Sequence, residues 1–228
     1  AALHPVLTRN FDEIGEVLDR FQGGRYRETL HLGVVTTFAA NWLIPRLPAF
    51  EAAHPGISLR IFTHNNRIDI AKEGLHMAVR FGHRAAWPWL EAEPLAEAPL
   101  TPLCAPELLP RLQVPQDLRT QRLLRSYRSD EWEAWFSAAG VTCPPLEGPV
   151  LDSSVAMAEL AAAGIGVALL PAAMFARQLG AGLLARPFVV DISAGRYWLT
   201  WPRGKALTPA MGQVRDWLVA TGGADEAA

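Results

Sequence analysis

The sequence predicts an α/β protein built from two lobes. A β-branched apolar run at 30–35 is followed by Thr36-Thr37, a helical pattern and a second strand pattern at 57–62, which makes one strand–helix–strand unit. Similar units recur between about residues 123 and 170. Segments near 93–98 and 196–201 are expected to carry the chain out of the first lobe and back again. Two crossings of this kind predict a hinged cleft between the lobes.

Further elements follow in order from composition and periodicity. Pro94, Pro99 and Pro102 prevent a continuous central strand between 90 and 103, which favours an extended crossover. Trp132, Trp135 and Phe136 give 130–139 an amphipathic helical pattern. The predicted helices are 67–73, 130–139, 155–163 and 209–220, and the predicted strands are 75–81, 123–126, 149–151, 167–170 and 197–201.

The first residues predict a linker helix over 1–24. Five apolar residues are spaced four, three, four and three apart, which is a coiled-coil seam narrow enough for a partner helix. They are Leu7, Phe11, Ile14, Leu18 and Phe21. Gly23-Gly24 ends the pattern. We expect a dimerisation helix, although a helix lying on its own domain is the alternative.

These patterns divide the chain into a linker and two regulatory subdomains. The linker covers 1–24, subdomain I covers 25–95 and 201–228, and subdomain II covers 96–200. With 228 residues, half of them hydrophobic, both lobes can bury a core of their own.

Composition narrows the cellular setting. A net charge of −2 gives no electrostatic footprint for nucleic acid, so contact with DNA would need another segment. Two cysteines, Cys104 and Cys143, without C-x-x-C or metal-like spacing, favour a reducing cytoplasm. No apolar run approaches the ~20 residues of a membrane helix, and the start lacks both a secretory signal and a methionine, which suggests a truncated or processed chain.

Catalytic signatures are missing from the sequence. It has no nucleophile elbow, zinc helix or phosphate loop, and its histidines are scattered without metal-ligand spacing. We therefore expect no enzyme activity, no metal and no cofactor.

Two hydroxyl pairs predict a binding site instead. Thr36-Thr37 and Ser153-Ser154 each stand between an apolar strand and a helix, so two helix starts would face each other across the cleft. Each start offers hydroxyls and unpaired N–H groups to a ligand. Ordinary helix capping by these residues is the alternative.

Other polar residues would join the same rim. Ser126, Tyr127 and Arg128 end a strand of the second lobe, and Arg128 could bind a carboxylate or pair with Asp130 or Glu131. Tyr197 lies on the return crossover, as a hinge hydrogen-bonding group or as a core aromatic residue. The set predicts a polar pocket suited to carboxylates, amides and sugars.

The chain also resembles a known family. The runs LGVVTT from residue 32, LIPRLPAF from residue 43 and HPGISL from residue 54 look like the start of the effector-binding domain of LysR-type transcriptional regulators. The runs THNNRID from residue 63, LLRSYRSDEW from residue 123, DSSVAM from residue 152 and YWLT from residue 197 resemble the AmpR branch, which controls inducible β-lactamase genes. The likeness extends over about residues 30–218.

The resemblance implies a fold, an effector and partners. The fold would be the type 2 periplasmic-binding-protein fold, with two Rossmann-like subdomains joined by two crossover strands. The effectors would be muramyl peptides from peptidoglycan precursors and recycling, with a nucleotide-linked pentapeptide opposing activation and anhydromuramyl peptides favouring it. DNA would be bound by an N-terminal winged helix-turn-helix domain absent from this chain, in a homodimer or homotetramer away from any membrane.

The resemblance also assigns individual residues. Thr37, Ser154 and Tyr197 match pocket positions of the branch, and Asp69 matches a position tied to switching between repressing and activating states. Thr36 replaces a common glycine, which would narrow the pocket or alter the basal state. The Trp87-Pro88-Trp89 loop replaces a glycine-rich loop, and its tryptophans suggest a partner surface.

Two other functions compete with this interpretation. A solute-binding protein of a transporter shares the cleft but should carry an export signal and no coiled-coil seam. A small α/β hydrolase using Ser153 or Ser154 would need a histidine base, and no histidine follows His83.

Overall fold

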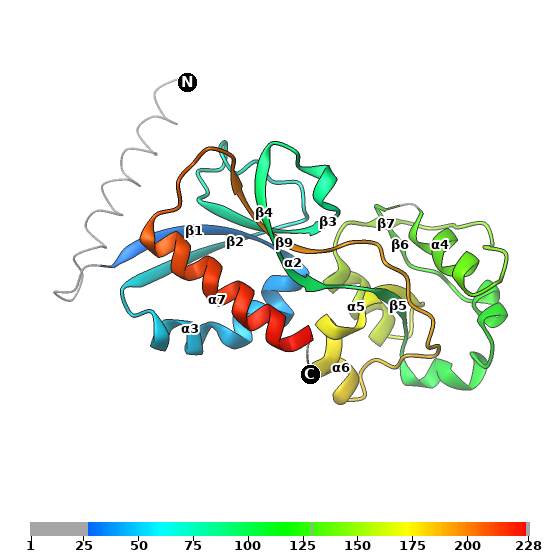
Figure 1. The fold of residues 1–228 in the computed structure, drawn as a ribbon. Helices are drawn as coiled ribbons and strands as arrows, with labels where there is room; N and C mark the ends of the chain where they lie inside the picture. Colours follow the sequence, from blue (N-terminus) through cyan, green and yellow to red (C-terminus); the bar gives the residue numbers. More distant parts are fainter. Residues whose placement is uncertain (1–26, 129, 227–228) are drawn as a thin grey trace, which may run out of the picture.

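Two α/β lobes lie side by side in the computed structural model, which describes residues 27–128 and 130–226 (Figure 1). The predicted linker helix and its seam residues lie outside the described residues. The two-lobed α/β fold with two crossovers is the one that the sequence predicts.

The first lobe is a five-stranded mixed sheet in the order β2-β1-β3-β9-β4. Its strands are β1 (Glu28–Val35), β2 (Ile57–His64), β3 (Met77–Gly82), β4 (Leu90–Glu97) and β9 (Arg196–Pro202). β1 pairs in parallel with β2 and β3, whereas β9 runs antiparallel between β3 and β4. The return strand β9 therefore completes the sheet of the lobe that the chain had left.

Helical segments cover this sheet. After β1 the chain forms α2 (Thr36–Phe38), a π-helical turn (Ala39–Leu43), a 3-10 turn (Ile44–Arg46) and α3 (Leu47–Ala53). Pro45 and Pro48 lack an N–H group, which disturbs regular α-helical bonding there. α7 (Pro209–Glu226) is longer than predicted and packs along β4, where a Cβ on Gly222 would lie 2.4 Å from the Leu95 carbonyl oxygen.

Within the described residues the second lobe contains two small sheets, three α-helices and the 3-10 helices Pro106–Arg111, Pro115–Thr120 and Ala172–Phe175. β5 (Leu100–Leu103) pairs antiparallel with β8 (Ala168–Pro171), and β6 (Arg125–Ser126) pairs in parallel with β7 (Val150–Leu151). The α-helices are α4 (Glu131–Ala138), α5 (Ser154–Ala162) and α6 (Ala176–Gly180). Trp135 and Phe136 of α4 are fully buried in the core of this lobe.

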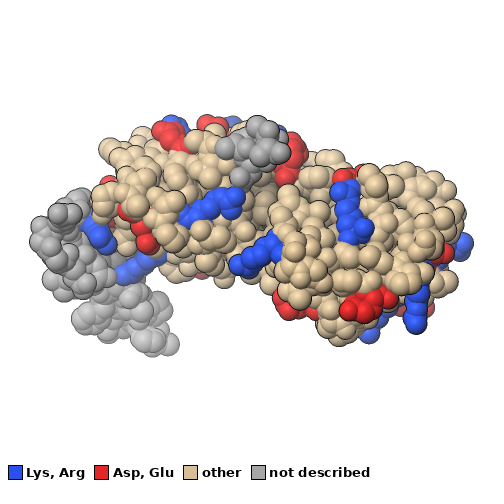
Figure 2. Space-filling view, turned by 90° about the horizontal axis from the view of Figure 1, so that it is seen from below, with Lys and Arg blue, Asp and Glu red and all other residues tan. Residues whose placement is uncertain are grey.

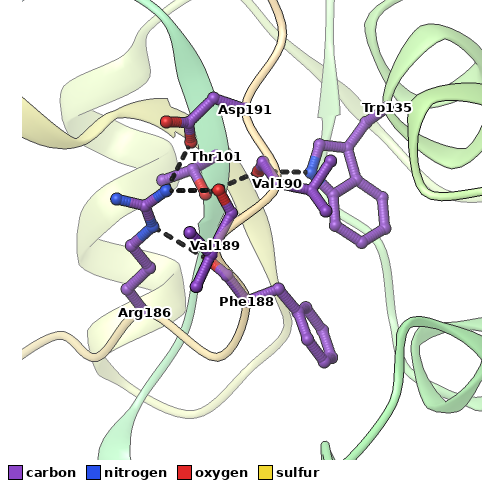
Figure 3. Close-up of polar contacts among 7 residues, drawn as sticks. All are labelled: Thr101, Trp135, Arg186, Phe188, Val189, Val190 and Asp191. Atoms are coloured by element: carbon purple, nitrogen blue, oxygen red, sulfur yellow. Dashed lines mark hydrogen bonds and ion pairs between the residues drawn. The ribbon is translucent and has the colours of Figure 1, made fainter.

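The two crossovers differ in construction. The outward one runs from β4 into β5 and breaks at Ala98-Pro99, as the prolines predict, with a register shift between Pro94 and Ala96. The return crossover is hydrogen-bonded to the second lobe before it enters β9 (Figure 3). Trp135 and Thr101 donate to the Val190 carbonyl at 3.0 and 3.1 Å.

Arg186 holds the same return segment from its other side. It donates to the carbonyls of Phe188 and Val189 at 2.9 Å each and pairs with Asp191 at 2.7 Å (Figure 3). The chain therefore enters β9 from a fixed point on the second lobe.

One predicted element is wrong. The expected helix at 67–73 is a turn over residues 70–74. The Asp69 carboxylate accepts the backbone N–H groups of Ala71 and Lys72 at 3.1 and 3.3 Å, and Gly74 has a φ of +65° that ends the turn. Local capping at both ends leaves room for a single turn.

Candidate functional site

A small cavity lies where the two lobes and the return crossover meet. Thr37 follows β1, Ser154 begins α5, Arg128 follows β6 and Tyr197 lies on β9, and all four line this cavity. Val35, Phe81, Leu100 and Pro171 complete the wall. Its volume of about 20 Å³ suits one water molecule. Polar groups from both lobes therefore meet at one point.

The two hydroxyl pairs are divided between structure and cavity. Thr37 and Ser154 line the cavity, whereas the hydroxyls of Thr36 and Ser153 make bonds elsewhere. The Thr36 hydroxyl donates to the His64 carbonyl at 3.1 Å, at the end of β2. Ser153 is the N-cap of α5 and accepts the Ala156 N–H at 3.3 Å, so the capping alternative holds for Ser153.

Arg128 is the charged wall of the cavity. It forms an ion pair with Glu131, and its Nη1 donates to the Tyr127 hydroxyl at 3.1 Å. Its guanidinium lies 4.8 Å from the centre of the Phe81 ring. Ser126 accepts the backbone N–H of Arg128 at 3.1 Å. Ser126 and Tyr127 therefore orient Arg128 rather than line the small cavity themselves.

The ion pair predicted as an alternative for Arg128 exists with Glu131, and it is partly buried rather than on the surface. Glu131 is only 5% exposed. Burial raises the pKa of Glu131, and the Arg128 guanidinium opposes that rise. The burial of Glu131 was missed by the sequence reasoning. Its spacing four residues before Trp135, on the apolar face of α4, was the available signal.

Tyr197 serves as both a core residue and a cavity wall. It is 2% exposed, and its ring packs against Phe38 and Phe81 with centroids 5.0 and 5.4 Å apart. Burial raises the pKa of its phenol, which Arg128 partly opposes, so the hydroxyl stays protonated near neutral pH. A protonated phenol can donate a hydrogen bond to a ligand at the hinge.

A larger pocket of about 530 Å³ adjoins the small cavity, and Phe81 and Arg128 line both. Its wall includes Trp87, which is 8% exposed and whose ring would lie 3.2 Å from a Cβ on Gly82, where φ is +146°. The idea that both tryptophans of the 87–89 loop form a partner surface is therefore wrong for Trp87. Trp89 is 63% exposed.

The THNNR run joins the lobes. Asn65 donates to the Asp152 carboxylate at 2.7 Å across the cleft, and the Arg67 guanidinium lies 5.6 Å from the Tyr127 ring centre. Asn66, with a φ of 74°, bonds both the N–H and the carbonyl of Phe81 at 2.9 and 2.6 Å. The run fixes the end of β2 against β3 and against the second lobe.

His64 supports that arrangement in its neutral form. Its Nδ1 accepts the Asn66 N–H at 2.9 Å. Burial, reinforced by nearby Arg80, lowers its pKa from 6.5 to about 4. Arg80 itself is buried and donates to Thr200 and to the Ile68 carbonyl at 3.2 and 2.6 Å.

Asp69 lies outside both pockets. Besides its turn bonds it pairs with Lys72 at 3.2 Å, and hydrogen bonds from the Lys72 backbone and ammonium lower its pKa. Any role of Asp69 in switching would therefore act through this turn.

The described residues, 27–128 and 130–226, contain no cluster of His, Cys, Asp and Glu that could hold a metal ion. In the same part of the chain no helix is both long and apolar enough to cross a membrane. On the face that Figure 2 shows, basic and acidic side chains are interspersed rather than gathered into one basic patch.

Comparison with known proteins gives a consistent result. The model of the LysR substrate binding domain matches residues 23–223. The chain is 57% identical over 216 residues to the HTH-type transcriptional activator AmpR of Rhodobacter capsulatus, which covers 95% of this chain and 74% of that protein.

Solved structures agree with the sequence match. The effector domain of AmpR from Pseudomonas aeruginosa superposes with a TM-score of 0.83 at 52% identity, covering 88% of this chain and 97% of that one. An effector binding domain from Citrobacter freundii, with a threonine, a serine and a tyrosine substituted, gives 0.82 at 41% identity over 86% and 99%.

Proposed function

Because this chain belongs to the LysR family of transcriptional regulators, as an AmpR-type effector-binding domain, we propose that it senses muramyl peptides between its lobes and so controls β-lactamase expression. The observation that carries the proposal is the meeting of Thr37, Ser154 and Tyr197 around one cavity. Hydroxyls from both lobes and the hinge converge there, beside the Arg128 guanidinium. Such a set suits a ligand with amide and carboxylate groups.

The Citrobacter freundii variant supports this choice of residues. Its substituted serine and tyrosine have the same sequence separation as Ser154 and Tyr197, and its threonine–serine separation equals that from Thr36 to Ser154 and exceeds that from Thr37 by one position. The cavity lining, rather than the spacing, favours Thr37 over Thr36. The residue types and spacings favour one shared site. Thr36 and Ser153 then act indirectly, by holding the backbone that presents their neighbours.

The size of the cavity sets a condition for binding. About 20 Å³ cannot hold a peptide end, so the lobes must separate before a ligand reaches Thr37 and Ser154. Opening breaks the bond between Asn65 and Asp152. An effector shifts the protein between states only through different affinities for the open and closed arrangements. Binding would therefore be coupled to lobe geometry.

The rest of the regulator follows from the same proposal. A winged helix-turn-helix domain preceding this chain would bind DNA in the cytoplasm, and residues 1–24 would join it to subdomains I (25–95 and 201–228) and II (96–200). Seam residues such as Leu7 and Ile14 would hold a dimer or tetramer together. Asp69 would influence switching through its turn. The role is regulatory rather than enzymatic.

Calorimetric titration tests the proposal. The chain is titrated with a uridine diphosphate-linked muramyl pentapeptide and with an anhydromuramyl tripeptide. We expect one-to-one binding of at least one peptide, weakened roughly fivefold by Tyr197→Phe through loss of one hydrogen bond. Thr63→Val, at an exposed threonine on β2, is the matched control and should change nothing. No binding of either peptide to a folded chain would refute the proposal.

A further inference from the structure

The larger pocket beside Arg128 combines groups from both lobes and from the return segment. The first lobe contributes Asn66, Phe81 and His83, while 192–194 of the return segment close one side. The second lobe contributes Arg128, Asp130 and Glu131 among others. Its volume of about 530 Å³ accommodates a side chain of a peptide ligand. A ligand in the small cavity would reach this pocket by passing Arg128.

Glu131 has an unusual position in the pocket wall. One carboxylate oxygen, Oε1, accepts the Arg128 Nε–H, and the Ser126 hydroxyl also faces the carboxylate. The other oxygen, Oε2, is buried and has no hydrogen-bond partner among the residues that the structure describes. Buried carboxylate oxygens normally accept hydrogen bonds, so this oxygen retains the capacity to accept one from a ligand.

Arg128 offers the complementary chemistry. A guanidinium has five N–H donors, and within the described part of the chain Arg128 uses Nε on Glu131 and Nη1 on the Tyr127 hydroxyl. Stacking on the Phe81 and Tyr127 rings, at 4.8 and 4.9 Å, leaves the edge of the group available for a carboxylate. A cationic hydrogen-bond donor, Arg128, and an anionic acceptor, Glu131, therefore lie next to each other.

We propose that this pocket holds the zwitterionic end of a diaminopimelate residue, with Arg128 binding its carboxylate and Glu131, aided by Asp130, binding its ammonium. The inference rests on the proposed function, because it takes the ligand to be a muramyl peptide. Muramyl peptides carry diaminopimelate or lysine at the third position of the peptide. Only diaminopimelate ends in a carboxylate and an ammonium on one carbon, which is the arrangement that this pair of side chains recognises.

A series of matched ligands tests the pairing on the unmodified chain. Muramyl tripeptides are compared that end in diaminopimelate, in lysine, which lacks the terminal carboxylate, and in 2-aminopimelate, which lacks the terminal ammonium. We expect the diaminopimelate peptide to bind at least tenfold more tightly than either of the others by calorimetry. Affinities within threefold of one another would overturn the inference while leaving the proposed function intact.

Two variants on α4 assign the ammonium contact. Glu131→Gln should bring the diaminopimelate peptide to within threefold of the 2-aminopimelate peptide, whose own affinity should change little. Glu133→Gln, at an exposed position on the same helix, should preserve the full tenfold preference. Equal losses for both peptides in Glu131→Gln would show that Glu131 only orients Arg128, and would overturn its assignment. Failure of all three peptides to bind would refute the proposed function itself.

Discussion

The two strand-to-helix junctions that face each other across the cleft look alike in sequence and are built differently. Thr36-Thr37 follows β1 in the first lobe, and Ser153-Ser154 precedes α5 in the second. In each pair the first hydroxyl is bonded within the protein and the second residue lines the small cavity. In both lobes the first residue of the pair is the one whose hydroxyl is bonded, but the hydrogen-bond partners of the two hydroxyls differ.

That difference concerns what each junction depends on. Ser153 caps its own helix, so the second junction is local. Thr36 instead donates to the main-chain carbonyl of His64, 28 positions away, and the ring of the same residue accepts the Asn66 N–H. The first junction therefore depends on a contact with a distant strand, while the second depends on a bond within the first turn of its own helix. Equal sequence patterns can thus give junctions that depend on different parts of the chain, and the residue that the first junction contacts carries a buried titratable ring.

The largest expected effect is a loss of stability in acid. The folded protein keeps His64 neutral down to about pH 4, whereas the unfolded chain binds a proton near 6.5. The contribution of neutral His64 to the free energy of unfolding is therefore fully present above pH 6.5, and it is lost as the pH drops towards 4. Allowing for partial solvent exposure, we expect a loss of roughly 2 kcal/mol from this group.

The loss of stability in acid is measured by urea unfolding of the parent chain and of the His64→Gln variant between pH 7 and pH 4. The variant should show a flatter dependence on pH, since it cannot titrate there. His83→Gln, on the wall of the larger pocket, is the matched control and should keep the slope of the parent chain. A His64→Gln profile parallel to that of the parent chain would show that this ring does not carry the loss of stability in acid.

A smaller effect separates the two serines of the second junction. Ser153→Ala removes the N-cap of α5 and should lower the free energy of unfolding by about 1 kcal/mol. Ser154→Ala, at the first residue of the same helix, should change it by less than about 0.5 kcal/mol. Urea denaturation at pH 7 compares them directly. Equal losses would contradict the division between capping and cavity residues.

Much of this arrangement was predictable from the sequence. Strand patterns followed by hydroxyl residues located both junctions, and the aromatic strand 197–201 located Tyr197 on the return crossover. The prolines of 90–103 predicted an extended crossover instead of one continuous strand, as β4 and β5 show. These features depend on residues close together in the chain, so the periodicity of apolar residues and the positions of turn residues predict them.

Other features depend on contacts between distant residues. Which threonine faces the cavity is decided by the His64 carbonyl at the end of another strand. The helix expected at 67–73 gives way to a turn because Asp69 caps it and the buried Arg80 binds the Ile68 carbonyl beside it. Trp87 is buried because Gly82 leaves space for its ring. A single sequence does not record such pairings.

The most direct test of the division between the hydroxyls is a titration of two double variants with the nucleotide-linked muramyl pentapeptide. Thr37→Val with Ser154→Ala removes the two cavity hydroxyls, and Thr36→Val with Ser153→Ala removes the two structural ones. Two lost hydrogen bonds of about 1 kcal/mol each predict roughly thirtyfold weaker binding for the first pair. Less than a threefold change is expected for the second pair. Equal losses in both, or a larger loss in the second, would contradict the account.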